Sequence, residues 1–347
     1  MMKALVDGGP GNKSWETVAL PDLVDDRDAI VRVDAVTICG TDLHILKGDV
    51  PEVQPGQILG HEAVGTVVEV GTAVSGITVG SRVLVSCISG CGRCRYCRKG
   101  SYGQCVNGGG WILGHLINGT QAEFVRVPFA DTSLYPLPDA VSDESALMLA
   151  DIVPTAYEVG VLNGTVSPAD TVAIVGAGPI GLASIMTAHL FSPARVIAID
   201  LAPSRLEAAK HFGADVALLA DEDPERAVME LTEGLGADVV IEAVGTPDTF
   251  ELCTRLVRPG GHVANVGVHG KPATLHLETL WIKNVTITTG LVDTYSTSTL
   301  LQMLASGQLD TAKFITHRFH LHEMMEAYSV FADASSTGAL KVALTRD

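Results

Sequence analysis

The chain has 347 residues, of which 47% are apolar, so its length suits about two globular domains with cores of their own. Charged residues make up 18%, and the 36 glycines follow no repeat, which excludes a disordered and a fibrous protein. The formal net charge of −17 repels phosphate backbones and anionic lipid, so we expect neither nucleic-acid nor membrane partners. Residues 1–7 lack the long apolar stretch of a targeting signal, and we expect a cytoplasmic protein.

The pattern of apolar and polar residues changes along the chain. The first 150 residues alternate apolar and polar positions between glycines, which predicts strands. Between about 170 and 290, short apolar strands alternate with helical patterns, as in a parallel sheet covered by helices on both faces. The last fifty residues return to a mixed pattern of strand-like and helical segments. Earlier in the chain, Ser142 is expected to cap a helix that begins near Glu144. Strands are predicted at 29–36, 64–71, 82–85, 172–175, 196–199, 239–241, 262–266, 285–289 and 339–344, and helices at 204–212 and 249–256.

A glycine motif lies at the start of the region of alternating strands and helices. Gly176-Ala177-Gly178-Pro179-Ile180-Gly181 fits G-x-G-x-x-G between a predicted strand and a helical pattern, and Asp200 ends the next strand about 20 residues later. Glycines let the backbone approach a pyrophosphate, which binds the amides at the start of a helix. Asp200 can accept hydrogen bonds from ribose hydroxyls and would repel a 2′-phosphate, so the pattern favours NAD over NADP, with Arg205 as a further ribose contact. The alternative is a strand-to-helix turn without a ligand.

Four cysteines form a C-x2-C-x2-C-x7-C array, at Cys91, Cys94, Cys97 and Cys105. Four thiolates at such spacing suit a tetrahedral zinc ion, and a full set of protein ligands makes that zinc structural. An iron–sulfur cluster is the alternative, because it uses similar ligands. Cys87, in a predicted strand, and Cys253, in a predicted helix, are interpreted as ordinary buried cysteines.

A second metal site is indicated by Cys39, His61 and Asp151, which lie in separate segments. A catalytic zinc takes three protein ligands of these types and keeps one position open. Spacing alone does not separate such ligands from structural residues.

The chain resembles the zinc-containing alcohol dehydrogenases of the medium-chain dehydrogenase/reductase family along nearly its whole length. The resemblance is carried by Cys39-Gly40-Thr41-Asp42-Leu43-His44, Gly60-His61-Glu62-Ala63-Val64-Gly65, the four-cysteine array and the motif at 176–181. It implies an α/β protein in which a Rossmann NAD-binding domain, 153–294, is inserted into a β-rich GroES-like catalytic domain, 1–152 and 295–347. It also implies two zinc ions per chain and a homo-oligomer, with a tetramer favoured.

The resemblance implies that Cys39, His61 and Asp151 hold the catalytic zinc, with Glu62 beside it as a possible alternate ligand. Many relatives have a cysteine where this chain has Asp151, but a carboxylate also binds zinc. The implied reaction is reversible hydride transfer from a zinc-bound alkoxide to NAD, which yields an aldehyde or ketone. Thr41 would take the alcohol proton, His44 would pass it to solvent, and Asp42 would orient a ligand or its loop. Further implied cofactor contacts are Thr155, Val244, Val266, Gly267, Val268 and, at the pyrophosphate, Lys341.

Several alternatives stay open. The segments 149–155 and 109–123 also resemble the glutathione-independent formaldehyde dehydrogenases, although this chain lacks their long insertions. A formaldehyde dehydrogenase or dismutase and a polyol dehydrogenase are therefore alternatives to an alcohol dehydrogenase. Trp111 either shapes the substrate pocket or anchors its own loop. A non-catalytic NAD-sensing or nucleic-acid-binding protein, with the cysteine array as a zinc ribbon, is the alternative from another class.

Overall fold

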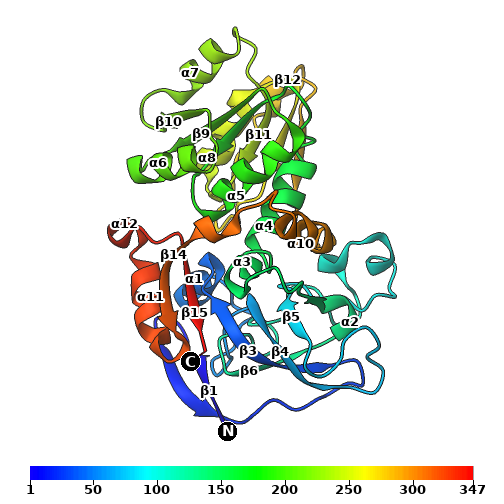
Figure 1. Ribbon diagram of the computed structural model, residues 1–347. Coiled ribbons are helices and arrows are strands. Elements are labelled where there is room, and N and C mark those ends of the chain that lie inside the picture. The colour runs from blue at the N-terminus through cyan, green and yellow to red at the C-terminus, as the bar shows by residue number, and fades with distance from the viewer. Residues whose placement is uncertain (347) are drawn as a thin grey trace. The chain divides into compact units, whose positions relative to one another are not determined.

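The computed structural model describes residues 1–346 (Figure 1). The chain forms two compact units, one of Met1–Asp151 together with the residues from Asp293 onward, and one of Ile152–Val292. The expected domain boundaries, after 152 and after 294, lie one and two residues beyond these divisions.

The first unit is built on a seven-stranded sheet in the order β14-β15-β3-β4-β5-β7, with β6 also paired to β3. All pairs are antiparallel except β14 with β15. β3 lies in the middle, and seven of its nine residues are buried because apolar side chains cover both of its faces. The strands are β3 (Ala29–Thr37), β4 (Ala63–Val70), β5 (Arg82–Val85), β6 (Phe124–Val127), β7 (Leu134–Pro136), β14 (Ile315–His320) and β15 (Lys341–Thr345), beside a separate antiparallel pair of β1 (Met2–Asp7) and β2 (Lys13–Val18).

Helices of this unit lie around the sheet, and α11 packs against β14 and β15 (Figure 1). Its inward side carries buried Met324, Ala327, Tyr328 and Phe331, which join the core of the unit. The helices are α1 (Gly40–Lys47), α2 (Ala130–Ser133), α3 (Asp143–Leu147), α10 (Thr297–Ala305), α11 (Met324–Ala332) and α12 (Ala334–Thr337), with short 3₁₀ turns η1 (Cys97–Lys99), η2 (Tyr102–Gln104), η5 (Thr311–Phe314) and η6 (Leu321–Glu323).

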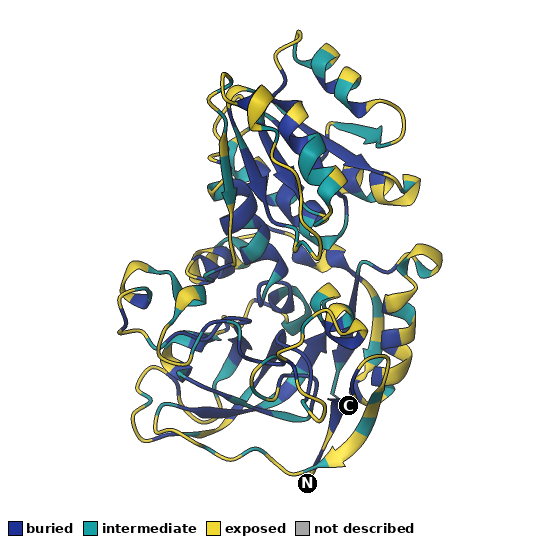
Figure 2. Cartoon of the chain, turned by 180° about the vertical axis from the view of Figure 1, so that it is seen from behind, coloured by how far each residue is buried: buried dark blue, intermediate teal, exposed yellow. Residues whose placement is uncertain are grey.

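The second unit has a six-stranded parallel sheet in the order β10-β9-β8-β11-β12-β13. Its central strands are buried, as the dark blue strands of Figure 2 show, and helices cover them. The strands are β8 (Thr171–Val175), β9 (Arg195–Asp200), β10 (Val216–Leu219), β11 (Ala237–Glu242), β12 (Val257–Asn265) and β13 (Thr286–Thr289). The helices are α4 (Ile152–Thr155), the π-helical η3 (Ala156–Leu162), α5 (Pro179–Ala188), η4 (His189–Phe191), α6 (Pro203–His211), α7 (Pro224–Leu231), α8 (Pro247–Leu256) and α9 (Leu277–Leu280).

Most predicted elements are present, and one local prediction is wrong. Ser142 caps α3, since its side chain accepts a hydrogen bond from the Ser145 N–H. Cys253 lies buried in α8, but Cys87 is not in a strand. β5 ends two residues earlier, and the Cys87 N–H donates to the Ala150 carbonyl instead of a neighbouring strand.

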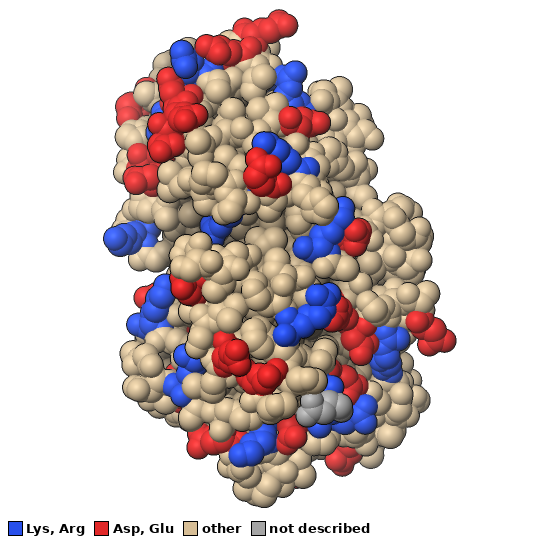
Figure 3. Space-filling model, turned by 60° about the vertical axis from the view of Figure 1, so that its left-hand side comes forward, with Lys and Arg blue, Asp and Glu red and all other residues tan. Residues whose placement is uncertain are grey.

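Within residues 1–346, no helix combines the length and the apolar character needed to cross a membrane. On the face drawn in Figure 3, Lys and Arg side chains are interspersed with Asp and Glu. That face therefore presents no continuous basic surface.

Candidate active site

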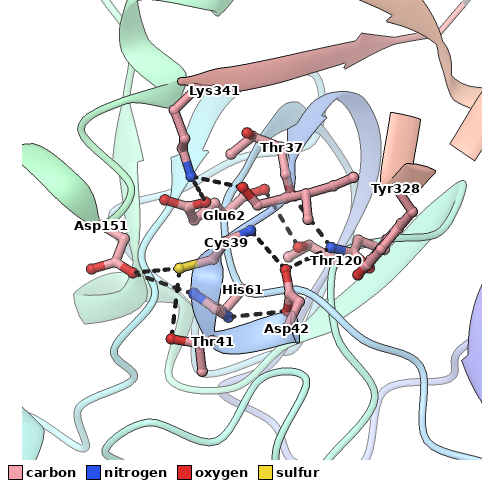
Figure 4. Close-up of polar contacts among 12 residues, drawn as sticks. Thr37, Cys39, Thr41, Asp42, His61, Glu62, Thr120, Asp151, Tyr328 and Lys341 are labelled. Carbon is pink, nitrogen blue, oxygen red and sulfur yellow. Dashed lines mark hydrogen bonds and ion pairs between the residues drawn. The ribbon is translucent and has the colours of Figure 1, made fainter. Parts of the chain in front are cut away.

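Cys39, His61 and Asp151 converge within the first unit (Figure 4). One ligand atom from each lies within 4.8 Å of the other two. Asp151 Oδ2 is 3.3 Å from His61 Nε2 and 3.9 Å from Cys39 Sγ. A thiolate, an imidazole and a carboxylate converging on one point are donors that suit zinc, and three protein ligands leave a fourth position open.

Local backbone features place two of these ligands. Cys39 lies two residues after the end of β3 and is the N-cap of α1. Its N–H donates to Asp42 Oδ2 at 2.8 Å, which holds the start of the helix. His61 follows Gly60, whose φ of +92° is in the left-handed region. A Cβ on Gly60 would lie 2.5 Å from Gln121 Cγ, so a larger residue would displace the loop that carries His61.

The charges at this point favour a cation. Burial opposes a proton on His61, but Asp151 and Cys39 outweigh it and hold the pKa of His61 well above its usual value. For the neighbouring Glu62 carboxyl, burial itself raises the pKa, because it disfavours the charged form. A buried group of anionic ligands that draws a proton to its imidazole also suits a divalent metal ion in place of that proton. The residues present therefore fit the zinc that the motifs imply.

Glu62 and Lys341 form a buried ion pair next to this cluster. Lys341 Nζ donates to Glu62 Oε2 at 2.5 Å and to the Ile38 carbonyl at 3.0 Å, and both charged side chains are 1% exposed. Lys341 is expected to contact a pyrophosphate. In the structure its ammonium lies buried in the first unit and forms an ion pair with Glu62, because the buried carboxylate needs a counter-charge.

Asp42 is also buried beside the metal ligands. Its Oδ2 accepts hydrogen bonds from the Cys39 N–H and, at 2.9 Å, from Gln121 Nε2, while its Oδ1 lies 3.9 Å from His61 Nδ1. Tyr328 Oη in turn donates to Gln121 Oε1 at 2.7 Å. Sequence reasoning misses Gln121 and Tyr328, because they lie 79 and 207 positions from the residues they bond and follow no local spacing.

Thr41 and His44 lie on α1, three residues apart. Thr41 Oγ1 is 3.6 Å from Cys39 Sγ, next to the ligand cluster. His44 faces solvent with 51% of its side chain exposed, and its Nδ1 is 2.8 Å from Asp49 Oδ2. Thr41 is thus half-buried beside the ligand cluster, and His44, about one turn further along the same helix, is exposed.

The four-cysteine array forms a second convergent cluster. The Sγ atoms of Cys91, Cys94, Cys97 and Cys105 lie within 4.8 Å of one another, and Asn107 Nδ2 donates to Cys91 Sγ at 3.4 Å. Hydrogen bonds from backbone N–H groups, first that of Cys97, lower the pKa of Cys94 to about 6, whereas burial raises the pKa of Cys97 to about 12. Four adjacent thiols cannot all ionise without a cation, so the site fits a tetrahedral metal ion.

In the second unit, the glycine motif links β8 to α5. Gly176 has a φ of +99°, and a Cβ on Gly181 would collide with the Gly176 carbonyl, so both positions require glycine. A Cβ on Gly178 would meet no atom within 4 Å, which leaves the backbone open to a ligand there. Pro179 and Ile180 begin α5, whose first amides follow this open position.

Asp200 lies at the end of β9 beside that loop. Its Oδ2 accepts the Ala177 N–H at 2.7 Å and its Oδ1 accepts the Ala202 N–H at 2.8 Å, and Arg205 Nη1 is 3.9 Å from Oδ2. These bonds fix the plane of the carboxylate and leave each oxygen a further acceptor position. The arrangement fits an adenosine ribose bound next to the glycine loop.

The other expected cofactor residues have different environments. Val244 and Val268 are 47% and 78% exposed, whereas Val266 is buried at 8%. Gly267 packs against protein, because a Cβ there would collide with the Gly245 N. Thr155 ends α4.

Trp111 lies near a metal ligand. Its ring contacts that of His61 edge-on at 6.3 Å between centroids, and it stacks on His115 at 4.1 Å. The ring thus lies next to one metal ligand and also packs on a histidine of its own loop.

Comparison with known proteins extends over the whole chain. Residues 25–139 match the alcohol dehydrogenase GroES-like domain, and residues 179–306 match the zinc-binding dehydrogenase domain. An alcohol dehydrogenase from Cupriavidus necator is 38% identical over 99% of this chain and 98% of its own length. The zinc-dependent alcohol dehydrogenase 2 from Streptococcus pneumonia, in its apo form, is 48% identical, with a TM-score of 0.96 over 100% of this chain and 99% of that one.

Two more distant solved structures carry nicotinamide cofactors. A dehydrogenase from E. coli CFT073, complexed with NADH, is 27% identical with a TM-score of 0.89, and a zinc-binding dehydrogenase from Sinorhizobium meliloti 1021, bound to NADP, is 29% identical with a TM-score of 0.88. Each covers 99% of this chain and 99% of its own. The ligand cluster, the cysteine array, the glycine loop and these full-length similarities agree, and the chain belongs to the zinc-containing alcohol dehydrogenases of the medium-chain dehydrogenase/reductase family.

Proposed function

We propose that this zinc-dependent alcohol dehydrogenase oxidises an alcohol reversibly with NAD at a zinc ion held by Cys39, His61 and Asp151. The observation that carries the proposal is the convergence of these three donors, with one coordination position left for a substrate. When bound, zinc supplies a Lewis acid that favours loss of the alcohol proton, and the nicotinamide accepts the hydride. Glu62, with one carboxylate oxygen that has no hydrogen-bond partner among the described residues, is the candidate alternate ligand.

The preference for NAD over NADP rests on Asp200. Its carboxylate is 8% exposed and is oriented by the backbone amides of Ala177 and Ala202. A fixed carboxylate accepts hydrogen bonds from ribose hydroxyls and repels a 2′-phosphate. Arg205 is close enough to Asp200 to contact the same ribose, but its guanidinium is nearly half exposed and offers a weaker contribution.

The proton path rests on α1. Thr41 Oγ1 lies next to Cys39 Sγ and can accept the proton of a substrate hydroxyl while donating its own. His44 stands three residues further along the helix with its ring in solvent, where it can exchange a proton with water. Asp42 orients His61 from the side opposite to Asp151.

The second zinc of the proposal is structural and is held by the four-cysteine array. All four coordination positions are filled by protein sulfur, so no position is left for a substrate. The array lies in a segment whose only helical elements are the 3₁₀ turns η1 and η2, and a metal ion would supply the fold that this segment lacks otherwise.

We further propose that the chain assembles with copies of itself. β13 is an edge strand of the parallel sheet, and neighbouring residues expose large apolar side chains. Leu277, Trp281 and Ile282 are 62%, 73% and 68% exposed. An open strand edge beside apolar side chains favours pairing with an identical edge. Sedimentation of the purified protein would reveal the oligomer, and a tetramer is the assembly favoured by the family.

The function is tested by initial rates of NADH formation from one panel of substrates. Zinc-replete protein is assayed with primary, secondary and aromatic alcohols, a polyol and hydrated formaldehyde, each with NAD and with NADP. We expect an alcohol with NAD to give the highest kcat/KM. Leading activity with formaldehyde or with the polyol would instead favour a formaldehyde dehydrogenase or a polyol dehydrogenase. Absence of turnover in protein that holds two zinc ions would contradict the choice of substrates, and absence with one zinc ion would contradict the Asp151 ligand set.

A further inference from the structure

A chain of buried polar side chains leads from α11 to the metal ligand His61. Tyr328 is 1% exposed and Gln121 is 0% exposed, and neither is among the site residues that the family resemblance implies. Tyr328 comes from α11, whereas Gln121 lies in the segment just before β6. Figure 4 shows Tyr328 and Asp42 on the same side of His61, away from Asp151.

The phenol of Tyr328 fixes how the Gln121 amide is turned. Burial raises the pKa of Tyr328 well above its usual value, so its hydroxyl stays protonated and donates to Gln121 Oε1 at 2.7 Å. With the amide oxygen engaged there, the amide nitrogen must face the other way. Gln121 Nε2 accordingly donates to Asp42 Oδ2 at 2.9 Å. The reverse turn would set the amide oxygen against a buried carboxylate, which is unfavourable.

The fixed amide in turn determines which oxygen of Asp42 is left for His61. Asp42 Oδ2 already accepts two hydrogen bonds, from the Gln121 amide and from the Cys39 N–H. Asp42 Oδ1 and His61 Nδ1 face each other at 3.9 Å, and neither has a hydrogen-bond partner among residues 1–346. Both are buried polar atoms, so a small approach would satisfy both. A proton held on Nδ1 leaves Nε2 with the lone pair that a metal needs.

Packing ties the same glutamine to the loop of the metal ligand. A Cβ on Gly60 would lie 2.5 Å from Gln121 Cγ and 2.9 Å from the Gln121 N. The residue next to His61 is therefore in close contact with the residue that orients Asp42. Gln121 thus contacts Asp42 through its side-chain amide, and its Cγ and backbone nitrogen pack against Gly60, next to His61.

We propose that Gln121 and Tyr328 are positioning residues for the catalytic metal. Gln121, whose amide is fixed by Tyr328, engages one oxygen of Asp42, which holds the other oxygen toward His61 Nδ1 and aims His61 Nε2 at the metal. This role presupposes the metal centre of the proposed function. It also explains why two uncharged polar side chains from distant parts of the sequence are buried together beside it.

The test compares the zinc affinities of the wild type, three single variants and the double variant Tyr328→Phe/Gln121→Met. Tyr328→Phe removes one hydroxyl and keeps the ring. Gln121→Met keeps the shape but removes the side-chain hydrogen bonds to Tyr328 and Asp42 and a longer one, at 3.5 Å, to the Thr37 carbonyl. Tyr135→Phe is the matched control, because it removes a phenol that donates to the Thr294 carbonyl at 2.8 Å in the same unit. Each holoenzyme is titrated with a chromogenic chelator, and the release of each of the two zinc ions is followed together with alcohol oxidation.

We expect Tyr328→Phe to lower the affinity for one of the two zinc ions by about three- to tenfold, which is equivalent to the loss of one neutral hydrogen bond. Gln121→Met should lower the affinity for the same zinc ion by about tenfold or more, which is the range observed when residues that orient metal ligands are replaced. In the double variant the two effects should not add, because Tyr328 acts through Gln121. The other zinc ion and the Tyr135→Phe variant should match the wild type.

Unchanged zinc affinity in both Gln121→Met and Tyr328→Phe would overturn the assignment. An equal loss in Tyr135→Phe would also overturn it, because the effect would then be a general loss of stability. Since Gln121→Met is measured independently, the result does not depend on the folding of Tyr328→Phe. Wild-type protein with only one zinc ion would instead contradict the proposed function, which separates the two failures.

Discussion

The buried ion pair between Glu62 and Lys341 makes the stability of the first unit sensitive to one substitution. Lys341→Met removes the ammonium and keeps most of the side-chain volume. It leaves the Glu62 carboxylate 1% exposed without its counter-charge, and one of its oxygens already has no hydrogen-bond partner among the described residues. Breaking a buried pair on one side costs about 3–5 kcal/mol of unfolding free energy. For a unit of about 200 residues this lowers the melting temperature by about 6–20 °C.

Scanning calorimetry of the purified variant measures this loss directly. The double variant Lys341→Met/Glu62→Gln is the control, because it removes both charges and should recover at least half of the lost stability. A single variant that melts within about 2 °C of the wild type would refute the reasoning, since the carboxylate would then need no partner. A double variant no more stable than the single one would show that side-chain packing, and not charge, causes the loss.

Three further predictions concern the other sites. Cys94→Ser should lose one zinc ion per chain and lower the folded yield while the surviving protein keeps its cofactor preference; normal metal content by elemental analysis would contradict the structural zinc. Asp200→Gly should lower kcat/KM with NAD about 10- to 150-fold more than kcat/KM with NADP, which corresponds to the loss of hydrogen bonds to a charged acceptor. An unchanged ratio of the two kcat/KM values would mean that other residues determine the choice of cofactor. Thr41→Val should lower kcat about 10²- to 10⁴-fold with zinc content unchanged, and near-normal turnover would remove Thr41 from the proton path.

Features that depend on neighbouring residues could be predicted from the sequence. The strand before the glycine motif, the glycines themselves and Asp200 lie close together along the chain, and they form the expected strand, turn and helix. The four cysteines converge for the same reason, because 14 positions separate the first from the last. Strand β10 was harder to predict, since all four of its residues are only half-buried and an acidic loop follows.

Contacts between distant segments could not be predicted in this way. Lys341 lies 279 positions from Glu62 and Tyr328 lies 207 positions from Gln121, so no local spacing connects the members of either pair. The family resemblance suggests a pyrophosphate contact for Lys341, whereas the fold buries its ammonium against Glu62. Such pairings depend on how β15 and α11 pack within the first unit, and that packing follows from the whole core.

The role of Asp151 as a ligand of the catalytic zinc is the central claim, and Asp151→Ala tests it most directly. Zinc content and NADH formation are measured on the same preparation, with Asp139→Ala, a change at an exposed carboxylate, as the control. We predict that Asp151→Ala loses one zinc ion and alcohol-dependent turnover while NAD binding stays normal, and that the control keeps two zinc ions and full activity. Two zinc ions with near-normal turnover in Asp151→Ala would contradict the account, because another residue would then complete the metal site.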